Sequence, residues 1–281
     1  MDANKRCDFL LVIESKNGNP NGDPDLEGRP RCDLDSSGLI TPTSVKRKVR
    51  DMWYESGESI WVHPKNFLND EKSKVVKESG VDPKDSFGID KAMCERYLDV
   101  RAFGGVTNIG VEKGIGVRGA IQIGIGSTSS PIDIQGITIT RCCGLDSKND
   151  DGKKVKDREM GRSSFVSYGL YTMQGVFTPV CARNNGFTKE DLDNFFDVLP
   201  YVYSENPSAS RGGVRIRAIY VFEHPSERGI IPEYLLMEAV YPKLKVEVPQ
   251  SADDFEWVDL NELQKNLGER ATVSNLVPQS L

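Results

Sequence analysis

Apolar residues along the chain predict a core built from both strands and helices. Phe9 to Ile13 is a continuous apolar run, which indicates a buried first strand. Alternating apolar positions from Val117 to Ile125 and from Ile132 to Ile139 are typical of strands with one buried face. Phe165 to Phe177 is predicted as a long strand or bent ribbon, and Arg215 to Phe222 as the strand that closes the core.

Two amphipathic helices are predicted between these strands. Thr41 is a good N-cap with Pro42 at the first helical position, and apolar residues follow at helical spacing: Val45, Val49, Met52 and Trp53. Thr188 caps a second helix with its own apolar stripe, and Pro200 is expected to bend its last turn. Residues 56 to 98 are polar and irregular, which indicates an insertion ending in a helix around Asp90 to Leu98.

Turn-forming residues and charges mark two loops. Lys16 to Arg31 is rich in Gly, Asn, Asp and Pro, and Asp146 to Arg162 is charged and nearly free of apolar residues, as in an exposed loop or hairpin. The resulting order β, α, β, insertion, β, α, β predicts an α+β fold of the ferredoxin-like or RRM-like type in one domain over residues 1 to 281.

Composition excludes several classes of protein. The chain of 281 residues is 38% hydrophobic and 28% charged, which is ordinary for a globular protein. No apolar run is long enough for a membrane span or a signal peptide, so we expect no membrane partner and a cytoplasmic location. Six cysteines without a C-x-x-C pair and two histidines give no zinc pattern, so no metal or other cofactor is expected.

The net charge of −6 is unevenly distributed. From Glu247 to Arg270 there are seven acidic residues against two basic ones. Basic residues gather instead at Arg29 to Arg50, Arg141 to Arg162 and Arg211 to Arg217. A local basic track for nucleic acid is therefore compatible with an acidic chain.

Three motifs suggest small ligands but lack the necessary context. Gly114 to Gly119 matches G-x-G-x-x-G, yet a strand rather than a helix is expected after it, which favours a tight loop. Asn17 to Gly22 imitates half of an EF-hand loop, but Gly28 stands where the closing glutamate belongs. The aspartates at 23, 25, 33 and 35 suit metal-dependent cleavage, although turn aspartates more often cap backbone N–H groups.

Cations in the first helix and nearby loops are better candidates for phosphate contacts. Lys46 and Arg50 are four residues apart with Arg47 next to them, so all three are predicted on one flank of the helix. Arg101 and Phe103 pair a cation with a ring suited to stacking on a base, although Phe103 is equally compatible with a core position. Met160 in the charged segment is a possible apolar wedge between bases.

Seven motifs follow one another along the chain: DFLLVIESKNGNPNGDPDLEGRPR, TPTSVKRKVR, DVRAFGGV, VRGAIQ, ITITR, MGRSSFVSYGLY and SASRGG. Read in this order, they resemble the backbone subunit of type I-C CRISPR Cascade effector complexes, a member of the RAMP superfamily. The likeness runs from Asp8 to about Phe222. The segment between Trp53 and Val100 looks divergent and rather short beside other members of the family.

This resemblance implies an RRM-like palm with three additions: an inserted finger region at about 56–100, a β-hairpin thumb at about 142–164 and an acidic C-terminal segment at about 224–281. It implies a non-catalytic protein that polymerises head-to-tail along a CRISPR guide RNA, beside other Cascade subunits, while the guide pairs with a target DNA strand. The RNA-binding residues expected on this basis are Asn19, Asn21, Arg31, Thr43, Lys46, Arg47, Arg50, Arg101, Phe103, Arg118, Arg158, Met160 and Arg162.

Two other functions stay open from the sequence. Related subunits of type III complexes cleave target RNA through an aspartate in the loop after the first strand, and Asp33 lies in the corresponding region. The chain would then be a metal-dependent RNA endonuclease. A general RRM-type RNA chaperone is the third possibility, and it would bind RNA as a monomer without forming regular multimers.

Overall fold

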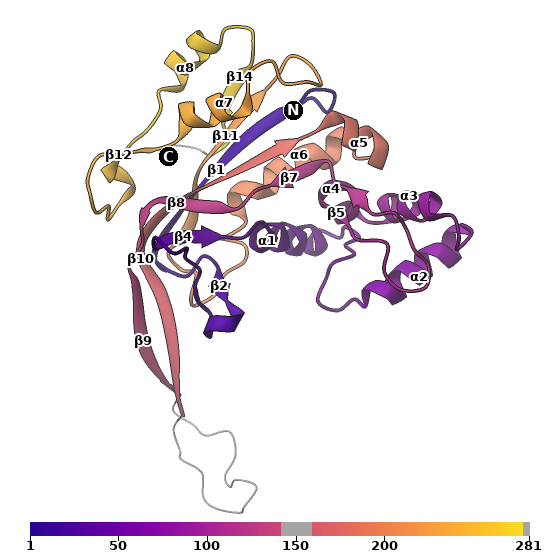
Figure 1. Ribbon diagram of the computed structural model, residues 1–281, viewed down its shortest axis with the longest axis horizontal. Coiled ribbons are helices and arrows are strands. Elements are labelled where there is room, and N and C mark those ends of the chain that lie inside the picture. The colour runs from indigo at the N-terminus through magenta and orange to yellow at the C-terminus, as the bar shows by residue number, and fades with distance from the viewer. Residues whose placement is uncertain (142–158, 278–281) are drawn as a thin grey trace, which may run out of the picture.

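A large antiparallel sheet forms the centre of the protein. The computed structural model describes residues 1–141 and 159–277. Strand β1 (Cys7–Gly18) lies between β10 (Glu159–Phe177) and β11 (Val214–Glu223), with Cys7 opposite Phe177 on one side and Glu223 on the other. The full order is β14-β11-β1-β10-β8-β4, with β7 and β9 also paired to β10 (Figure 1). The fold is therefore mixed α/β around an antiparallel sheet.

The remaining strands are short. Those of the large sheet are β4 (Ser37–Ile40), β7 (Ile121–Ile123), β8 (Gly126–Pro131), β9 (Ile134–Arg141) and β14 (Thr272–Asn275). Three separate two-stranded ladders pair β2 (Gly22–Asp23) with β3 (Arg29–Pro30), β5 (Gly104–Gly105) with β6 (Val117–Arg118), and β12 (Lys243–Leu244) with β13 (Phe255–Glu256).

The middle of strand β1, Phe9 to Ile13, is apolar at every position, as expected where both faces of a sheet are covered. Phe9, Leu11 and Ile13 enter one hydrophobic cluster, whereas Leu10 and Val12 enter another on the opposite face. All five side chains are fully buried. The predicted buried first strand is confirmed, and the period of two along a strand divides it between two cores.

One face of the sheet carries helices α1 (Pro42–Glu55), α4 (Leu98–Phe103), α5 (Pro179–Asn185) and α6 (Lys189–Val198). Both predicted helix starts are confirmed: Thr41 accepts a hydrogen bond from the Ser44 N–H, and Thr188 and Asp191 form a capping box. Pro200 lies in the 3-10 turn Leu199–Tyr201 that follows α6. Val49 and Trp53 of α1 share their core with Phe195 of α6.

The inserted segment forms a small helical unit with its own core. Helices α2 (Leu68–Ser79) and α3 (Ser86–Arg96) bury Val75, Val76, Ile89 and Met93 around Trp61. The helix expected near Asp90 to Leu98 is α3, which begins earlier and ends at Arg96. Helix α2 was not predicted because most of its residues are polar.

The C-terminal segment covers the other face of the sheet. Helices α7 (Glu233–Val240) and α8 (Leu260–Leu267), with the 3-10 turn Ala252–Asp254, bury Leu236, Met237 and Phe255 against Leu10 and Val12. Strand β14 then pairs with β11 and forms an edge of the sheet. The acidic segment is thus an integral layer of the fold.

The predicted single strand from Val117 to Ile125 is wrong. The chain forms β6, turns, and then forms β7. A side chain at Gly119 would collide with the backbone of Ala102, Phe103 and Gly104, so this close approach requires glycine. The prediction of a long ribbon at Phe165 to Phe177 is confirmed by β10, which begins at Glu159.

Strand β10 belongs to two structures in succession. Its residues 159–165 pair only with β9, as a two-stranded ribbon that extends away from the sheet (Figure 1). From Val166 onward it pairs with β1. Across the two described ranges, no helix combines the length and apolar character that crossing a membrane requires.

Candidate nucleic-acid interface

Two of the three predicted cations of α1 converge on one aromatic ring. The Lys46 ammonium lies 5.3 Å and the Arg50 guanidinium 5.2 Å from the centre of the Phe103 ring. Burial, followed by the nearby charge of Arg50, lowers the pKa of Lys46. These two cations therefore lie together at the junction of α1 and α4.

Phe103 is a core residue and not a platform for bases. Its side chain is 6% exposed and stacks on Trp53, with ring centres 5.3 Å apart. A nucleobase cannot reach a ring covered by an indole on one side and two cations on the other. The prediction that Phe103 stacks on RNA is wrong because the ring is needed to join α1, α4 and α6.

Arg50 is buried and neutralised by Asp99. Its Nε lies 2.7 Å from Asp99 Oδ2, and the same carboxylate accepts hydrogen bonds from the backbone N–H groups of Trp61 and Val62. Asp99 is fully buried, so Arg50 supplies the charge that its burial requires. This ion pair joins α1 to the inserted helical unit.

Arg47 lies on a different flank of α1. Its Nε donates to both carboxylate oxygens of Asp51, one turn later, and the side chain is exposed. Adjacent residues of a helix differ by about 100° in direction, so Lys46 and Arg47 cannot share a flank. The predicted grouping of three cations is therefore correct for Lys46 and Arg50 only.

The loop after β1 is folded against the start of α1. Asn21 Oδ1 accepts hydrogen bonds from both the N–H and the hydroxyl of Thr41, the residue that caps α1. Thr43, in the first turn of this helix, is exposed. The predicted residues Asn21 and Thr43 are thus brought together at the N-terminus of α1, where backbone N–H groups favour anions.

Asn19 and Arg31 stabilise this loop through their side chains, and each has one side-chain atom that no described residue bonds to. Asn19 Nδ2 donates to the Gly28 carbonyl oxygen at 2.7 Å, and Arg31 pairs with Asp23 at 3.0 Å. Within residues 1–141 and 159–277, no group bonds to the buried atoms Asn19 Oδ1 and Arg31 Nε. Oδ1 is an acceptor and Nε a donor, so each can bond to one further group.

Arg101 and Arg118 differ sharply in what they can contact. Arg101 forms a two-pronged ion pair with Asp191, and although burial opposes it, this carboxylate raises the pKa of the guanidinium. Arg118, on β6, is exposed, and among the described residues no carboxylate pairs with it. Arg118 is therefore available to a phosphate, whereas Arg101 links α4 to α6.

Three predicted residues belong to the extended ribbon or lie just beyond it. Arg162 is exposed on β10 opposite Thr138, and Met160 pairs with Thr140 two positions nearer the tip. Arg158 lies outside the described residues, as does most of the segment predicted as the thumb.

The sequence did not identify Lys48 as a candidate residue, and it indicated Arg211 only as part of a basic stretch. Lys48 is buried, donates to the Ser44 hydroxyl and carbonyl, and lies 5.0 Å from the centre of the Tyr203 ring. Burial, and then the charge of Arg211, lowers the pKa of Lys48 to about 8. The pattern of α1 contained no sign of this position because its partners come from residues 201–212.

Arg211 borders a cavity of about 340 Å³ beside the loop after β1. The cavity is lined by Tyr203, Ser204, Pro207, Ser208, Arg211, Gly212, Val214 and Arg215. Asn19 donates its backbone N–H to the Ser210 carbonyl, and Lys16 donates to that of Gly213. A side chain at Gly213 would collide with the Lys16 carbonyl, so glycine permits this close contact.

Asp33 and the two histidines lie in three different settings. Asp33 is exposed in a turn, where its Oδ1 accepts the Leu34 N–H at 2.7 Å. His63 stacks on Tyr54, and His224 is buried with its Nε2 2.8 Å from Asp8. Among the residues that the structure describes, no three His, Cys, Asp or Glu side chains come together as a metal site would require.

Comparisons with known proteins find one match to most of the chain and another to about a third of it. The family model described as CRISPR-associated protein Cas7 matches residues 5–261. A CRISPR-associated protein Cas7 from Haloferax volcanii is 32% identical over 111 residues, which is 37% of this chain and 33% of that relative. The aligned part therefore spans about a third of the relative's length.

Similarity to solved structures comes with low sequence identity. A chain of a CRISPR RNA-guided surveillance complex in its pre-nicking state has a TM-score of 0.50 at 12% identity, covering 95% of this chain and 90% of that chain. A chain from a second CRISPR RNA-guided surveillance complex gives 0.48 at 14% identity, covering 96% and 88%.

Proposed function

The chain belongs to the family of CRISPR-associated protein Cas7, and on this premise we propose that it binds a CRISPR guide RNA as a non-catalytic backbone subunit of a type I-C Cascade effector complex. Its partners are the guide RNA, further copies of itself and other Cascade subunits. A target DNA strand joins the complex by pairing with the guide, so the protein itself needs no base-specific contacts.

An RRM-like palm is the framework that we infer for this function. The order β11-β1-β10-β8, with α1 and α6 on one face, is that of a ferredoxin-like sheet in which the first and third strands are central. The inserted helices would then be the finger, and the β9–β10 ribbon the base of the thumb.

The observation that carries the proposal is a set of groups suited to phosphate, gathered at the start of α1. The N-terminus of α1 with Thr43, the loop with Asn19 and Arg31, and the turn with Arg211 are tied together by backbone hydrogen bonds. Two side-chain atoms here have no partner among the described residues: Arg31 Nε, a donor that suits a phosphate oxygen, and Asn19 Oδ1, an acceptor that suits a ribose hydroxyl. Such contacts recognise a sugar-phosphate chain whatever its sequence.

Salt dependence of RNA binding is the direct test. If each chain neutralises about four phosphates, the logarithm of the affinity for single-stranded RNA should fall with the logarithm of salt concentration with a slope near −3. Replacing Arg47 or Arg211 by alanine should reduce the slope by about 0.7, whereas Lys84→Ala, an exposed cation of the finger, should leave it unchanged. A flat salt response would contradict the proposal.

A further inference from the structure

The loop at residues 106–116 is folded around the ammonium of Lys72. This side chain is fully buried, and its Nζ donates hydrogen bonds to the backbone carbonyls of Thr107, Ile109 and Glu112. A lysine ammonium has three N–H donors, so all of them are used by the loop. Ser73 adds a hydrogen bond to the Glu112 carboxylate at 3.0 Å.

Asp90 of α3 fixes the second half of the same loop. One carboxylate oxygen accepts from the Thr107 hydroxyl, and the other accepts the N–H groups of Ile115 and Gly116 at 3.0 and 3.1 Å. A side chain at Gly114 would collide with this carboxylate and with Thr107. The conformation of the loop is therefore set by charged groups beneath it rather than by a hydrophobic core.

Three of the exposed side chains of this loop are apolar. Val106 is 65%, Val111 92% and Ile115 68% exposed. Lys113 lies between the last two and is exposed, and among the described residues no carboxylate pairs with it. Exposed aliphatic side chains on a preordered loop can be buried by a partner without the entropic cost of ordering the loop.

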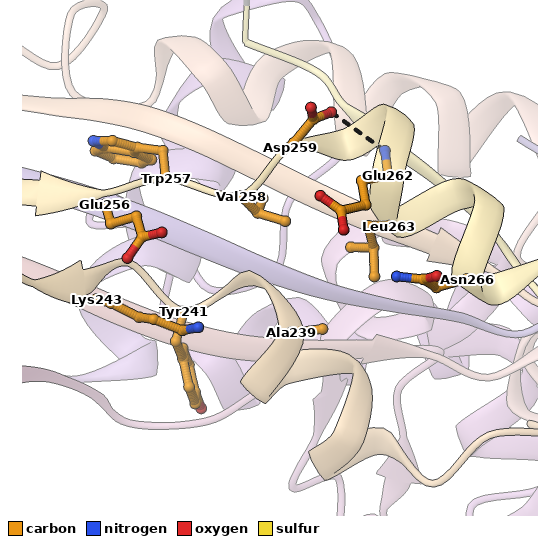
Figure 2. Close-up of a pocket in the computed structure, with 10 residues that line it drawn as sticks. All are labelled: Ala239, Tyr241, Lys243, Glu256, Trp257, Val258, Asp259, Glu262, Leu263 and Asn266. Atoms are coloured by element: carbon orange, nitrogen blue, oxygen red, sulfur yellow. Dashed lines mark hydrogen bonds between the residues drawn. The ribbon is translucent and has the colours of Figure 1, made fainter.

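A groove of complementary character lies in the C-terminal layer. Its volume is about 410 Å³, and Figure 2 shows apolar side chains along it, including Val258, which follows β13, and Leu263 of α8. Its border carries the acids Glu256 and Glu262, which have no ion pair within the described ranges, and one cation, Lys243, opposite Glu256 in the β12–β13 ladder. Asp259 is already occupied as the N-cap of α8, where it accepts the Asn261 N–H.

The loop and the groove lie far apart on one molecule. Figure 1 places the finger helices α2 and α3 on one side of the sheet and the C-terminal layer, with β12 and α8, on the opposite side. A contact between two such unlike surfaces is heterologous, and it adds one molecule after another in an open chain.

We propose that the finger loop 106–116 of one copy docks in the C-terminal groove of the next copy, with Val111 and Ile115 against its apolar residues and Lys113 beside Glu256 and Glu262. The inference rests on the proposed function, because the copies are aligned by the RNA that they share. The acidic border of the groove repels phosphates, so its occupant is a cationic, apolar protein surface, and the loop has that character.

The contact between loop and groove is small, so we expect it to form only between copies that are bound to the same RNA. One loop in one groove buries less than the roughly 800 Å² per partner of a stable complex, so the free protein should be monomeric. RNA that holds two copies side by side raises their effective concentration and lets the contact close. Assembly and RNA binding are therefore separable by the length of the RNA.

A charge exchange tests the contact in the full chain. Lys113→Glu and Glu262→Lys should each raise the protein concentration needed for multimers on a long single-stranded RNA by about tenfold, and the double variant should recover most of this loss. Lys84→Glu and Glu269→Lys are matched controls, since they make the same charge changes at exposed positions outside loop and groove. Native mass spectrometry counts the copies on each RNA.

Two results would overturn the contact: single variants that behave like their controls, or a double variant no better than the worse single one. Binding to a short RNA covered by one chain should be the same for the wild-type chain and all variants. If the wild-type chain fails to bind that short RNA, the proposed function fails, and not the interface alone.

Discussion

Arg101 and Asp191, ninety residues apart in sequence, meet in a two-pronged ion pair with N–O distances of 2.8 and 2.9 Å. The same carboxylate completes the capping box of α6 by accepting the Thr188 N–H at 3.0 Å. One aspartate therefore fixes both the start of a helix and its contact with α4.

Replacing Asp191 by alanine should destabilise the protein by about 3 kcal/mol, because it leaves Arg101 partly buried without its counter-charge and removes half of the capping box. Urea unfolding would measure the loss. Asp197→Ala, at the end of the same helix where an acidic residue opposes the dipole, is the control and should cost little. Equal effects of the two substitutions would contradict the role assigned to Asp191.

The lowered pKa of Lys48 predicts how stability depends on pH. The folded state releases this proton near pH 8, whereas the unfolded chain holds it up to about pH 10.5, so between these values the unfolded state binds more protons. Burial of Lys48 therefore costs stability at and below pH 8, and this cost disappears as the pH rises toward 10.5.

The comparison that isolates Lys48 uses methionine, which keeps the length of the side chain and lacks the charge. Unfolding free energies of Lys48→Met should depend less steeply on pH in this window than those of the wild-type chain. Lys84→Met, at an exposed position, should follow the wild-type curve. Parallel curves for Lys48→Met and the wild type would rule out Lys48 as the titrating group.

Lys72→Met should release the finger loop while leaving the sheet folded. It removes a buried cation together with the donors for three carbonyl groups, and each unsatisfied buried group costs about 1–3 kcal/mol. Hydrogen exchange should accelerate at residues 106–116 and remain slow in β1. Lys74→Met, which loses only an exposed pair with Glu71, should show neither change.

Asp33→Ala should leave RNA chemistry unchanged. Asp33 is exposed in a turn, where its Oδ1 accepts the Leu34 N–H, and the proposed function assigns this carboxylate no part in cleaving RNA. Guide RNA with complementary RNA should stay intact with and without magnesium for both proteins. Magnesium-dependent cleavage by the wild-type chain that Asp33→Ala abolishes would restore the endonuclease hypothesis.

Local signals in the sequence were sufficient for the main elements of the fold. Thr41 and Thr188 each cap a helix through hydrogen bonds to a residue three positions later, so both helix starts are visible in the local sequence. The apolar run of β1 likewise indicates a strand that is buried on both faces. The antiparallel sheet and its helices could therefore be predicted. Helix α2 was not predicted because it packs on a separate small core and contributes few apolar residues to it.

The candidate site was predictable only as far as its contacts are local. Arg50 and Arg101 looked like free cations, and both are matched by acids, Asp99 and Asp191, that lie far away in sequence. Phe103 looked available and is covered by Trp53. Lys48 gained its setting from Tyr203 and Arg211, a partnership that exists only after folding brings the segments together.

Alternate side chains of strand β1 are buried in the two hydrophobic cores on opposite faces of the sheet. A change in the number of residues in this strand would therefore disrupt both cores. Deleting a single residue before Phe9 would be absorbed by the terminus, but deleting one between Leu10 and Val12 would turn every following side chain to the wrong layer. Natural variants of this protein should therefore vary in their loops and ribbon while this strand keeps its residue count.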